Sequence, residues 1–184
     1  NTGDFQVSFE EVFSEFKKGL QKVVKPEDVE THYDLGIAYK EMGLMDDAIG
    51  EFNVARQGCQ GKKKEVDCLT MLGMLHSMKG DFQAAVEDFR MALGNDTAVG
   101  DTEWALRYEL AVAHEQAGSP GKALGHLIHV QQASPDYRDV AARVEQLSQV
   151  TTPEDDAPPP KPRPRGGGGG GGGTPAGARK VGYV

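Results

Sequence analysis

Histidine spacing offers this chain one route to metal chemistry. His126 and His129 are three residues apart, a separation that on a helix can place two imidazoles on one metal ion. No Asp, Glu or Cys at matching spacing completes a ligand set around them. We therefore expect both side chains on an exposed helix surface, and we predict no metal and no cofactor.

Two cysteines, Cys59 and Cys68, are nine residues apart, and the chain has no further cysteines to complete a zinc finger. The pair leaves two interpretations open. Reduced thiols in a cytoplasmic protein are our main interpretation. A disulfide across the intervening loop is the alternative, and it requires an oxidising compartment.

Motifs of catalysis are absent from the sequence. The chain has no G-x-S-x-G nucleophile elbow, no G-x-x-x-x-G-K phosphate loop, no dinucleotide-binding glycine fingerprint and no H-E-x-x-H. Eight consecutive glycines, 166–173, follow a proline-rich stretch and not a strand, so they indicate a linker. We predict that the protein is not an enzyme.

The net charge of −8 is unevenly distributed over the 184 residues. Residues 151–184 hold three acidic and five basic side chains, a net +2, which leaves −10 for residues 1–150. An acidic body argues against nucleic-acid binding, which requires clustered Lys and Arg. No run of about 18 apolar residues and no secretory leader is present, so we expect a cytoplasmic protein without a membrane span. Because the chain begins with Asn and not Met, we expect it to be part of a longer protein.

A phrase of small and large residues recurs three times, at steps of 37 and 38 residues, and it indicates the fold. Such a period is close to the roughly 34 residues of a helix-turn-helix repeat that stacks into a solenoid. The matching positions are Leu35-Gly36, Gly43, Ala48 and Phe52, then Leu72-Gly73, Gly80, Ala85 and Phe89, then Leu110-Ala111, Gly118, Ala123 and Leu127.

This pattern resembles the tetratricopeptide repeat (TPR) family. The resemblance implies an all-α, right-handed α-solenoid of three helix pairs, at about 29–65, 66–103 and 104–135, followed by a capping helix at 136–150. His76 and His114 stand where the family usually has tyrosine, so we expect both to be partly buried structural imidazoles. The expected helix pairs are 29–42 with 45–58, 66–79 with 81–93, and 101–117 with 120–133.

The two ends of the chain differ from the repeats. Residues 1–28 contain a leader and an amphipathic helix over 8–24, opened by an S-x-x-E capping box at Ser8. Three interpretations of this helix stay open: it caps the first repeat, it occupies the groove, or it contacts a membrane surface or another molecule. Pro and Gly dominate residues 151–184, which we predict to be disordered. The apolar stripe that would dock is Phe9, Val12, Phe13, Phe16 and Leu20.

In TPR proteins the first helix of each pair, the A helix, lines a concave groove. The resemblance therefore implies a binding surface for an amphipathic helix or a small globular protein with a basic edge. The positions that line this surface lack the Lys, Asn and Arg of the carboxylate-clamp subfamily, so that mode of binding is not expected. The alternative is that some of these side chains pack between neighbouring A helices. The expected groove residues are Tyr33, Ile37, Lys40, Met74, Ser77, Tyr108, Val112 and Glu115.

The run 32–49, the preceding amphipathic helix and the Gly/Pro-rich tail also resemble C-terminal regions of large repeat proteins of myxobacteria. Some of these are scaffolds that link a Ras-like polarity GTPase to type IV pili. The resemblance implies that the partner is such a GTPase in its GTP state and that the output is motility. The alternative is a chaperone or assembly factor that shields an amphipathic helix of a secretion or pilus subunit.

Overall fold

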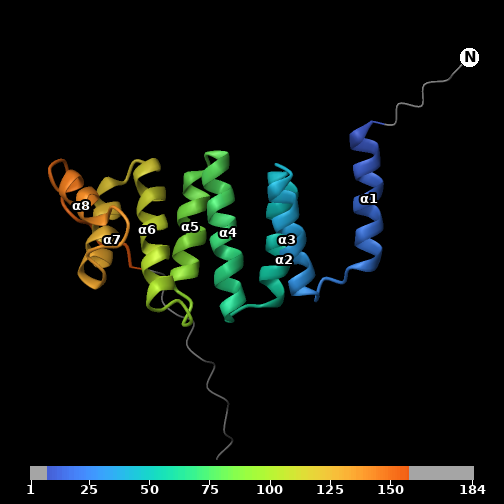
Figure 1. The fold of residues 1–184 in the computed structure, drawn as a ribbon, viewed down its shortest axis with the longest axis horizontal. Coiled ribbons are helices and arrows are strands. Elements are labelled where there is room, and N and C mark those ends of the chain that lie inside the picture. Colours follow the sequence, from blue (N-terminus) through green and yellow to red (C-terminus); the bar gives the residue numbers. More distant parts are fainter. Residues whose placement is uncertain (1–7, 158–184) are drawn as a thin grey trace, which may run out of the picture.

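The computed structural model describes residues 8–157, and this part of the chain contains helices and no strand. Figure 1 shows the helices standing side by side in chain order, with α1 at one end and α8 at the other. None of these helices is long and apolar enough to cross a membrane. The helices are α1 (Phe9–Val23), α2 (Val29–Glu41), α3 (Met45–Gly58), α4 (Lys63–Lys79), α5 (Phe82–Leu93), α6 (Asp101–Gln116), α7 (Pro120–Ala133) and α8 (Val140–Ser148).

The fold is an all-α solenoid of three TPR-like helix pairs, α2–α3, α4–α5 and α6–α7, as the repeated phrase predicts. Helices α3 and α4, and α5 and α6, join one pair to the next. The largest fully buried side chains include Phe52 and Phe89, which lie at equivalent positions of α3 and α5. The prediction that the Pro/Gly-rich tail is disordered falls mainly on residues 158–184, which lie outside the described part, as do residues 1–7.

Two mid-helix glycines explain how the helices of a pair approach so closely. A Cβ atom at Gly36 would lie 2.8 Å from the ring of Phe52, and one at Gly73 would lie 2.7 Å from the ring of Phe89. Glycine normally costs about 1 kcal/mol inside a helix relative to alanine. The phenylalanine rings occupy the space that a side chain would need, so this cost accompanies tight packing of the pair.

Helix α1 begins with the predicted capping box, in which Glu11 N–H donates to Ser8 Oγ and Ser8 N–H donates to the Glu11 carboxylate. Its contacts lie on the first helix pair. The Phe13 ring meets the Tyr39 ring edge-on at 5.8 Å, and Lys17 Nζ lies 2.8 Å from Asp47 Oδ1. Both partners belong to the outer side of the α2–α3 pair, which is the position of a helix that caps the first repeat.

The apolar stripe of α1 is divided between two surroundings. Phe13 and Leu20 face α2 and α3, where Leu20 lines a hollow of about 590 Å³ between α1 and the first pair. Val12 and Phe16 remain 56% and 52% exposed, so the helix also presents apolar surface away from the solenoid. The side chain of Phe9 lies outside the described part.

The third pair is covered by a cap that is shorter than expected. Helix α8 begins at Val140 and not at residue 136, because residues 134–139 form turns in which Arg138 adopts a positive φ of 47°. Val140 is fully buried against the third pair. After α8 the chain does not leave the molecule at once: residues 151–157 return along α7, and the N–H of Glu154 donates to the carbonyl of Gly121 at 2.9 Å. This differs from the expectation that the disordered tail starts at residue 151.

Candidate functional site

A hollow of about 360 Å³ opens between the three A helices, α2, α4 and α6. Its floor is apolar, and three carboxylates, Asp67, Asp101 and Glu109, stand around it. This hollow lies between the helices that the repeat pattern predicts to line the groove. The lining residues are Tyr33, Val66, Asp67, Thr70, Met71, Asp101, Thr102, Ala105, Leu106 and Glu109.

Tyr33 is the predicted groove residue that lines this hollow. Its ring packs edge-on against Phe52 at 5.3 Å, and Lys64 Nζ lies 3.7 Å above it. Burial, followed by the nearby charge of Asp67, raises the pKa of the Tyr33 hydroxyl. The Tyr33 ring therefore contributes to the core of the first pair as well as to the groove surface.

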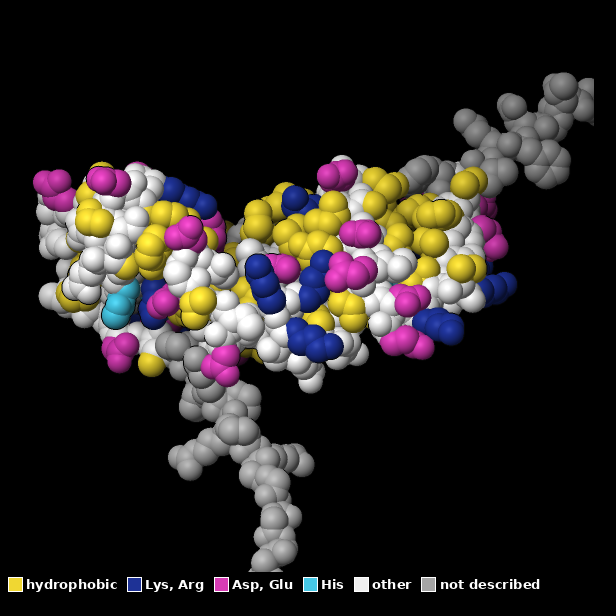
Figure 2. All heavy atoms as spheres, turned by 60° about the horizontal axis from the view of Figure 1, so that its bottom comes forward, with side chains coloured by type: hydrophobic (Ala, Val, Ile, Leu, Met, Phe, Trp, Pro, Cys, Tyr) yellow, Lys and Arg dark blue, Asp and Glu magenta, His cyan; other side chains and the backbone are white. Residues whose placement is uncertain are grey.

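The other predicted groove residues of the first two repeats differ in exposure. Met74 is 40% exposed on α4, whereas Ile37, Lys40 and Ser77 are half-buried. Met42 and Met78 add further exposed thioethers near the same end of the groove helices. Figure 2 shows hydrophobic side chains gathered over the half of the molecule that holds α1 to α4, with acidic and basic side chains among them.

Tyr108 does not line the open groove, which departs from the sequence expectation. It is only 8% exposed, its hydroxyl donates to Asp139 Oδ1 at 2.5 Å, and its ring meets the Tyr137 ring at 5.9 Å. Val112 packs in the same cluster, and Glu115 accepts a hydrogen bond from Arg143 of α8. Helix α8 and the preceding turn therefore cover the third-repeat part of the groove.

A second site lies where α5, α6 and α7 meet residues 151–157. The Nε2 atoms of His114 and His126 both face Asp156 Oδ2, at 2.7 Å and 3.2 Å. The two imidazole rings are nearly parallel, with an angle of 8° and centroids 5.7 Å apart. Both histidines are 3% exposed, so two buried imidazoles are within hydrogen-bond distance of one carboxylate oxygen.

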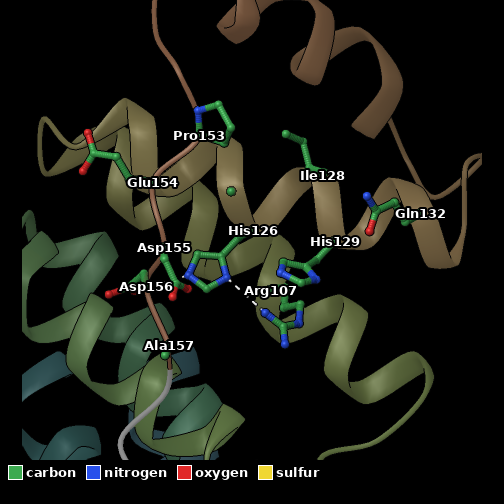
Figure 3. Close-up of a pocket in the computed structure, with 11 residues that line it drawn as sticks. Arg107, His126, Ile128, His129, Gln132, Pro153, Glu154, Asp155, Asp156 and Ala157 are labelled. Carbon is green, nitrogen blue, oxygen red and sulfur yellow. Dashed lines mark hydrogen bonds and ion pairs between the residues drawn. The ribbon is translucent and has the colours of Figure 1, made fainter.

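Three cationic side chains lie around Asp156 and the two imidazoles. Arg90 Nε lies 3.4 Å from Asp156 Oδ2, and Lys122 Nζ lies 3.9 Å from Asp156 Oδ1. Arg107 Nη1 donates to His126 Nδ1 at 3.4 Å, the contact drawn as a dashed line in Figure 3. We call the set Arg90, Arg107, His114, Lys122 and His126 the carboxylate cleft.

Two glycines of α7 let the backbone of the returning segment approach. A Cβ atom at Gly125 would collide with the carbonyl oxygen of Glu154, and one at Gly121 would collide with the Glu154 side chain. Arg90 Nη2 donates to the carbonyl of Ala157 at 3.0 Å, at the far end of the same segment. Residues 154–157 are therefore held at their backbone as well as through the carboxylate of Asp156.

Burial sets the protonation of the cleft. It lowers the pKa of His126 to about 4 and also lowers the pKa of His114, although the nearby Asp156 opposes both shifts. Burial acts to raise the pKa of Asp156, but the hydrogen bonds from His114 and His126 outweigh it and hold that pKa below its usual range. Near neutral pH the cleft therefore holds two neutral imidazoles and one carboxylate.

The geometry suits a carboxylate better than a metal ion. The ligand atoms of His114, His126 and Asp156 do lie within 4.8 Å of one another. However, Arg107 can only donate, so His126 Nδ1 accepts and its Nε2 carries the proton that points at Asp156. A divalent metal would need the lone pair of that Nε2 and would sit beside three cationic side chains.

The surroundings of the histidines agree only in part with the prediction from the sequence. His129 is exposed, as predicted, but His126 is buried, because the segment that carries Asp156 lies over it. His114 is buried and His76 half-buried, which agrees with structural imidazoles, although His114 also contacts Asp156. The sequence signal for this site is the acidic run 154–156 soon after a cap, together with two glycines four residues apart on α7.

The two cysteines are buried free thiols. Cys59 ends the first pair, where its thiol donates to the carbonyl of Arg56 at 3.6 Å, and Cys68 lies in α4. Burial raises the pKa of Cys68 to about 12 and also raises that of Cys59. Both side chains therefore act as packing residues of the core and not as nucleophiles.

No protein-family model matches the chain, and no curated protein matches it. Among solved structures, the chain is similar to the crystal structure of MamA, with a TM-score of 0.60 and 21% sequence identity over 77% of each chain. The fold is a TPR-like solenoid. At this identity the likeness establishes the fold alone, and it leaves the partner of the groove to be argued from the surface of this chain.

Proposed function

We propose that the protein is a non-catalytic interaction module that binds another protein through its concave groove. The observation that carries the proposal is the hollow between α2, α4 and α6, which has an apolar floor and an acidic margin. A helix with an apolar face fits such a groove, because its side chains can fill the floor at the spacing of successive turns.

The charges around the groove define the partner further. Glu109 is paired with Arg138 at 2.7 Å, whereas Asp67 and Asp101 have no ion-pair partner among residues 8–157. These two carboxylates therefore favour a partner helix with Lys or Arg along its edge. The exposed thioethers of Met74 and Met78 suit an apolar face of variable shape, because Met side chains adapt to their neighbours.

The experiment is to isolate the partner by affinity purification from the native cell and to measure its affinity by calorimetry. Asp67→Lys should weaken binding by about tenfold, about 1.4 kcal/mol, because it reverses a charge beside the floor. Glu145→Lys, the same charge change on the exposed side of α8, is the matched control and should change the affinity by less than about twofold.

Met74→Asp is a second variant of the groove, at an exposed position whose replacement leaves the core intact. It should weaken binding to a similar extent, because it places a carboxylate against the apolar face of the partner. Equal affinity of the wild type, Asp67→Lys and Met74→Asp, with unchanged helical circular dichroism, would show that the partner binds elsewhere.

The resemblance of residues 32–49 and the tail to myxobacterial motility scaffolds gives this proposal its sharpest form. In that form the protein is cytoplasmic, the partner is a Ras-like GTPase in its GTP state, and the complex acts on type IV pili at a cell pole. The alternative is a chaperone that shields an amphipathic helix of a secretion or pilus subunit. Loading the purified partner with GTP or GDP separates them, since an effector binds only the GTP form and a chaperone needs no nucleotide.

A further inference from the structure

We propose that the carboxylate cleft is a second binding site, which takes an extended acidic segment of another protein, and that residues 154–157 fill it as an internal stand-in. The site is separate from the groove: it is built on the α7 side of the third pair and involves α5, whereas the hollow lies between α2, α4 and α6. The proposal therefore does not depend on the groove having a partner.

Arg90, Gly121 and Gly125, which we call the seat, lie against the backbone of residues 154–157. The N–H of Glu154 donates to the Gly121 carbonyl at 2.9 Å, and the Ala157 carbonyl accepts from Arg90 at 3.0 Å. Gly125 leaves the space that the Glu154 carbonyl occupies. Any extended chain can make these contacts, so the seat specifies a conformation and not the side chains at its ends.

The cleft also favours an anion at one position. Arg90 pairs with Glu87 at 3.7 Å and Arg107 pairs with Glu103 at 2.8 Å, so both guanidinium groups have a second carboxylate nearby. The Nε atom of Arg90, however, is buried without a hydrogen-bond partner in the described part of the chain, and it lies 3.4 Å from Asp156 Oδ2. Leaving such a buried donor without an acceptor or an anion beside it is costly. The carboxylate of Asp156 lies beside this atom, and an Asp or Glu from another chain can take the same position.

The internal segment has few other attachments, so it can be exchanged. In Figure 3 the segment passes over His126 while the Glu154 side chain points away from that ring. Pro153, Glu154, Asp155 and Ala157 are exposed, whereas the side chain of Asp156 is only 7% exposed. The segment therefore depends on polar contacts, which a competing acidic peptide can replace, and not on burial of apolar side chains.

The test uses the full chain and a fluorescent peptide with the sequence of residues 151–157. Asp156→Lys repels the internal segment from Arg90 and Lys122 and should leave the cleft open. Fluorescence anisotropy should then show about tenfold tighter binding of the peptide to this variant than to the wild type, in which the internal segment competes. A peptide with Asn in place of Asp156 should not bind, because it brings no carboxylate to the position that faces Arg90 and the two imidazoles.

Gly125→Ala gives an independent control of the seat, because its Cβ would collide with the carbonyl of a bound segment. Added to Asp156→Lys, it should abolish peptide binding. Gly50→Ala is the matched change: Gly50 holds the same position in α3, and a Cβ there meets nothing within 4 Å. This second substitution should leave peptide binding unchanged.

Three results would overturn the proposal. The first is a helical Asp156→Lys protein, confirmed with the milder Asp156→Asn, that binds the peptide no more tightly than the wild type, since the segment would then be a fixed part of the cap. The second is Zn²⁺ binding to the wild type by calorimetry that His126→Ala abolishes, which would identify a metal centre. The third is equal binding of the Asn peptide, because recognition would then not involve the carboxylate.

Discussion

Acid should destabilise this protein through His126 in particular. The side chain is 3% exposed, and burial lowers its pKa from 6.5 to about 4. The unfolded chain therefore binds a proton near pH 6.5 that the folded chain accepts only near pH 4. Stability from this group is present above pH 6.5 and is lost as the pH falls toward 4, because the unfolded state then holds more protons.

The size of the effect follows from the shift. Each pKa unit corresponds to about 1.4 kcal/mol, so a displacement from 6.5 to about 4 amounts to a loss of about 3 kcal/mol at the acid end of this range. Asp156 adds to the loss at lower pH, since its depressed pKa stabilises the fold only while the carboxyl is ionised.

The assay is urea unfolding followed by circular dichroism from about pH 7 to about pH 4. His126→Gln cannot titrate and keeps an N–H that can reach Asp156, so its free energy of unfolding should fall by about 3 kcal/mol less than that of the wild type over this range. His129→Gln, at an exposed position of the same helix, should keep the wild-type pH dependence. Parallel curves for the wild type and His126→Gln would refute the argument from burial.

Three further outcomes test the packing. Gly36→Ala should destabilise the fold by about 1–3 kcal/mol, because its Cβ would lie 2.8 Å from the ring of Phe52, whereas Gly50→Ala should stabilise it by up to about 1 kcal/mol in the same urea titration. The thiol of Cys68, with a pKa of about 12, should react with a disulfide reagent near neutral pH only when urea unfolds the chain. Tyr108→Phe removes the hydrogen bond to the turn before α8 and should cost about 1 kcal/mol in thermal unfolding.

The repeats could be predicted from the sequence because their packing repeats with them. Gly36 and Gly73 each lie beneath a phenylalanine of the next helix, so the same small and large residues return at the same spacing. The turn glycines Gly43, Gly80 and Gly118 return for a related reason, since each adopts a positive φ close to 78°. Local packing constraints of this kind select the same residue types at the same position of each repeat.

The carboxylate cleft has no such recurring sequence pattern, because its residues come from distant parts of the chain. Asp156 is 30 and 42 residues from His126 and His114, and Ala157 is 67 residues from Arg90. The composition of residues 151–184 as a whole is rich in Pro and Gly and predicts disorder. It does not reveal the short acidic run 154–156, which polar contacts hold against the helices. Tyr108 differs from the prediction for a related reason: its repeat position faces a groove only where no cap follows, and here α8 covers it.

The two candidate sites have opposite charge and share one helix. The groove uses the first half of α6, with Ala105 and Glu109 beside the acidic hollow, while the cleft uses Arg107 and the end of the same helix at His114. Because α6 packs against α5 and α7 on one side and presents the hollow on another, a basic helix and an acidic segment can bind together without competing for surface. The two sets of residues lie on different parts of α6, so Asp67→Lys should leave binding of the acidic peptide intact, and Gly125→Ala should leave the groove partner bound. If either substitution weakened both interactions, the two surfaces would belong to a single site.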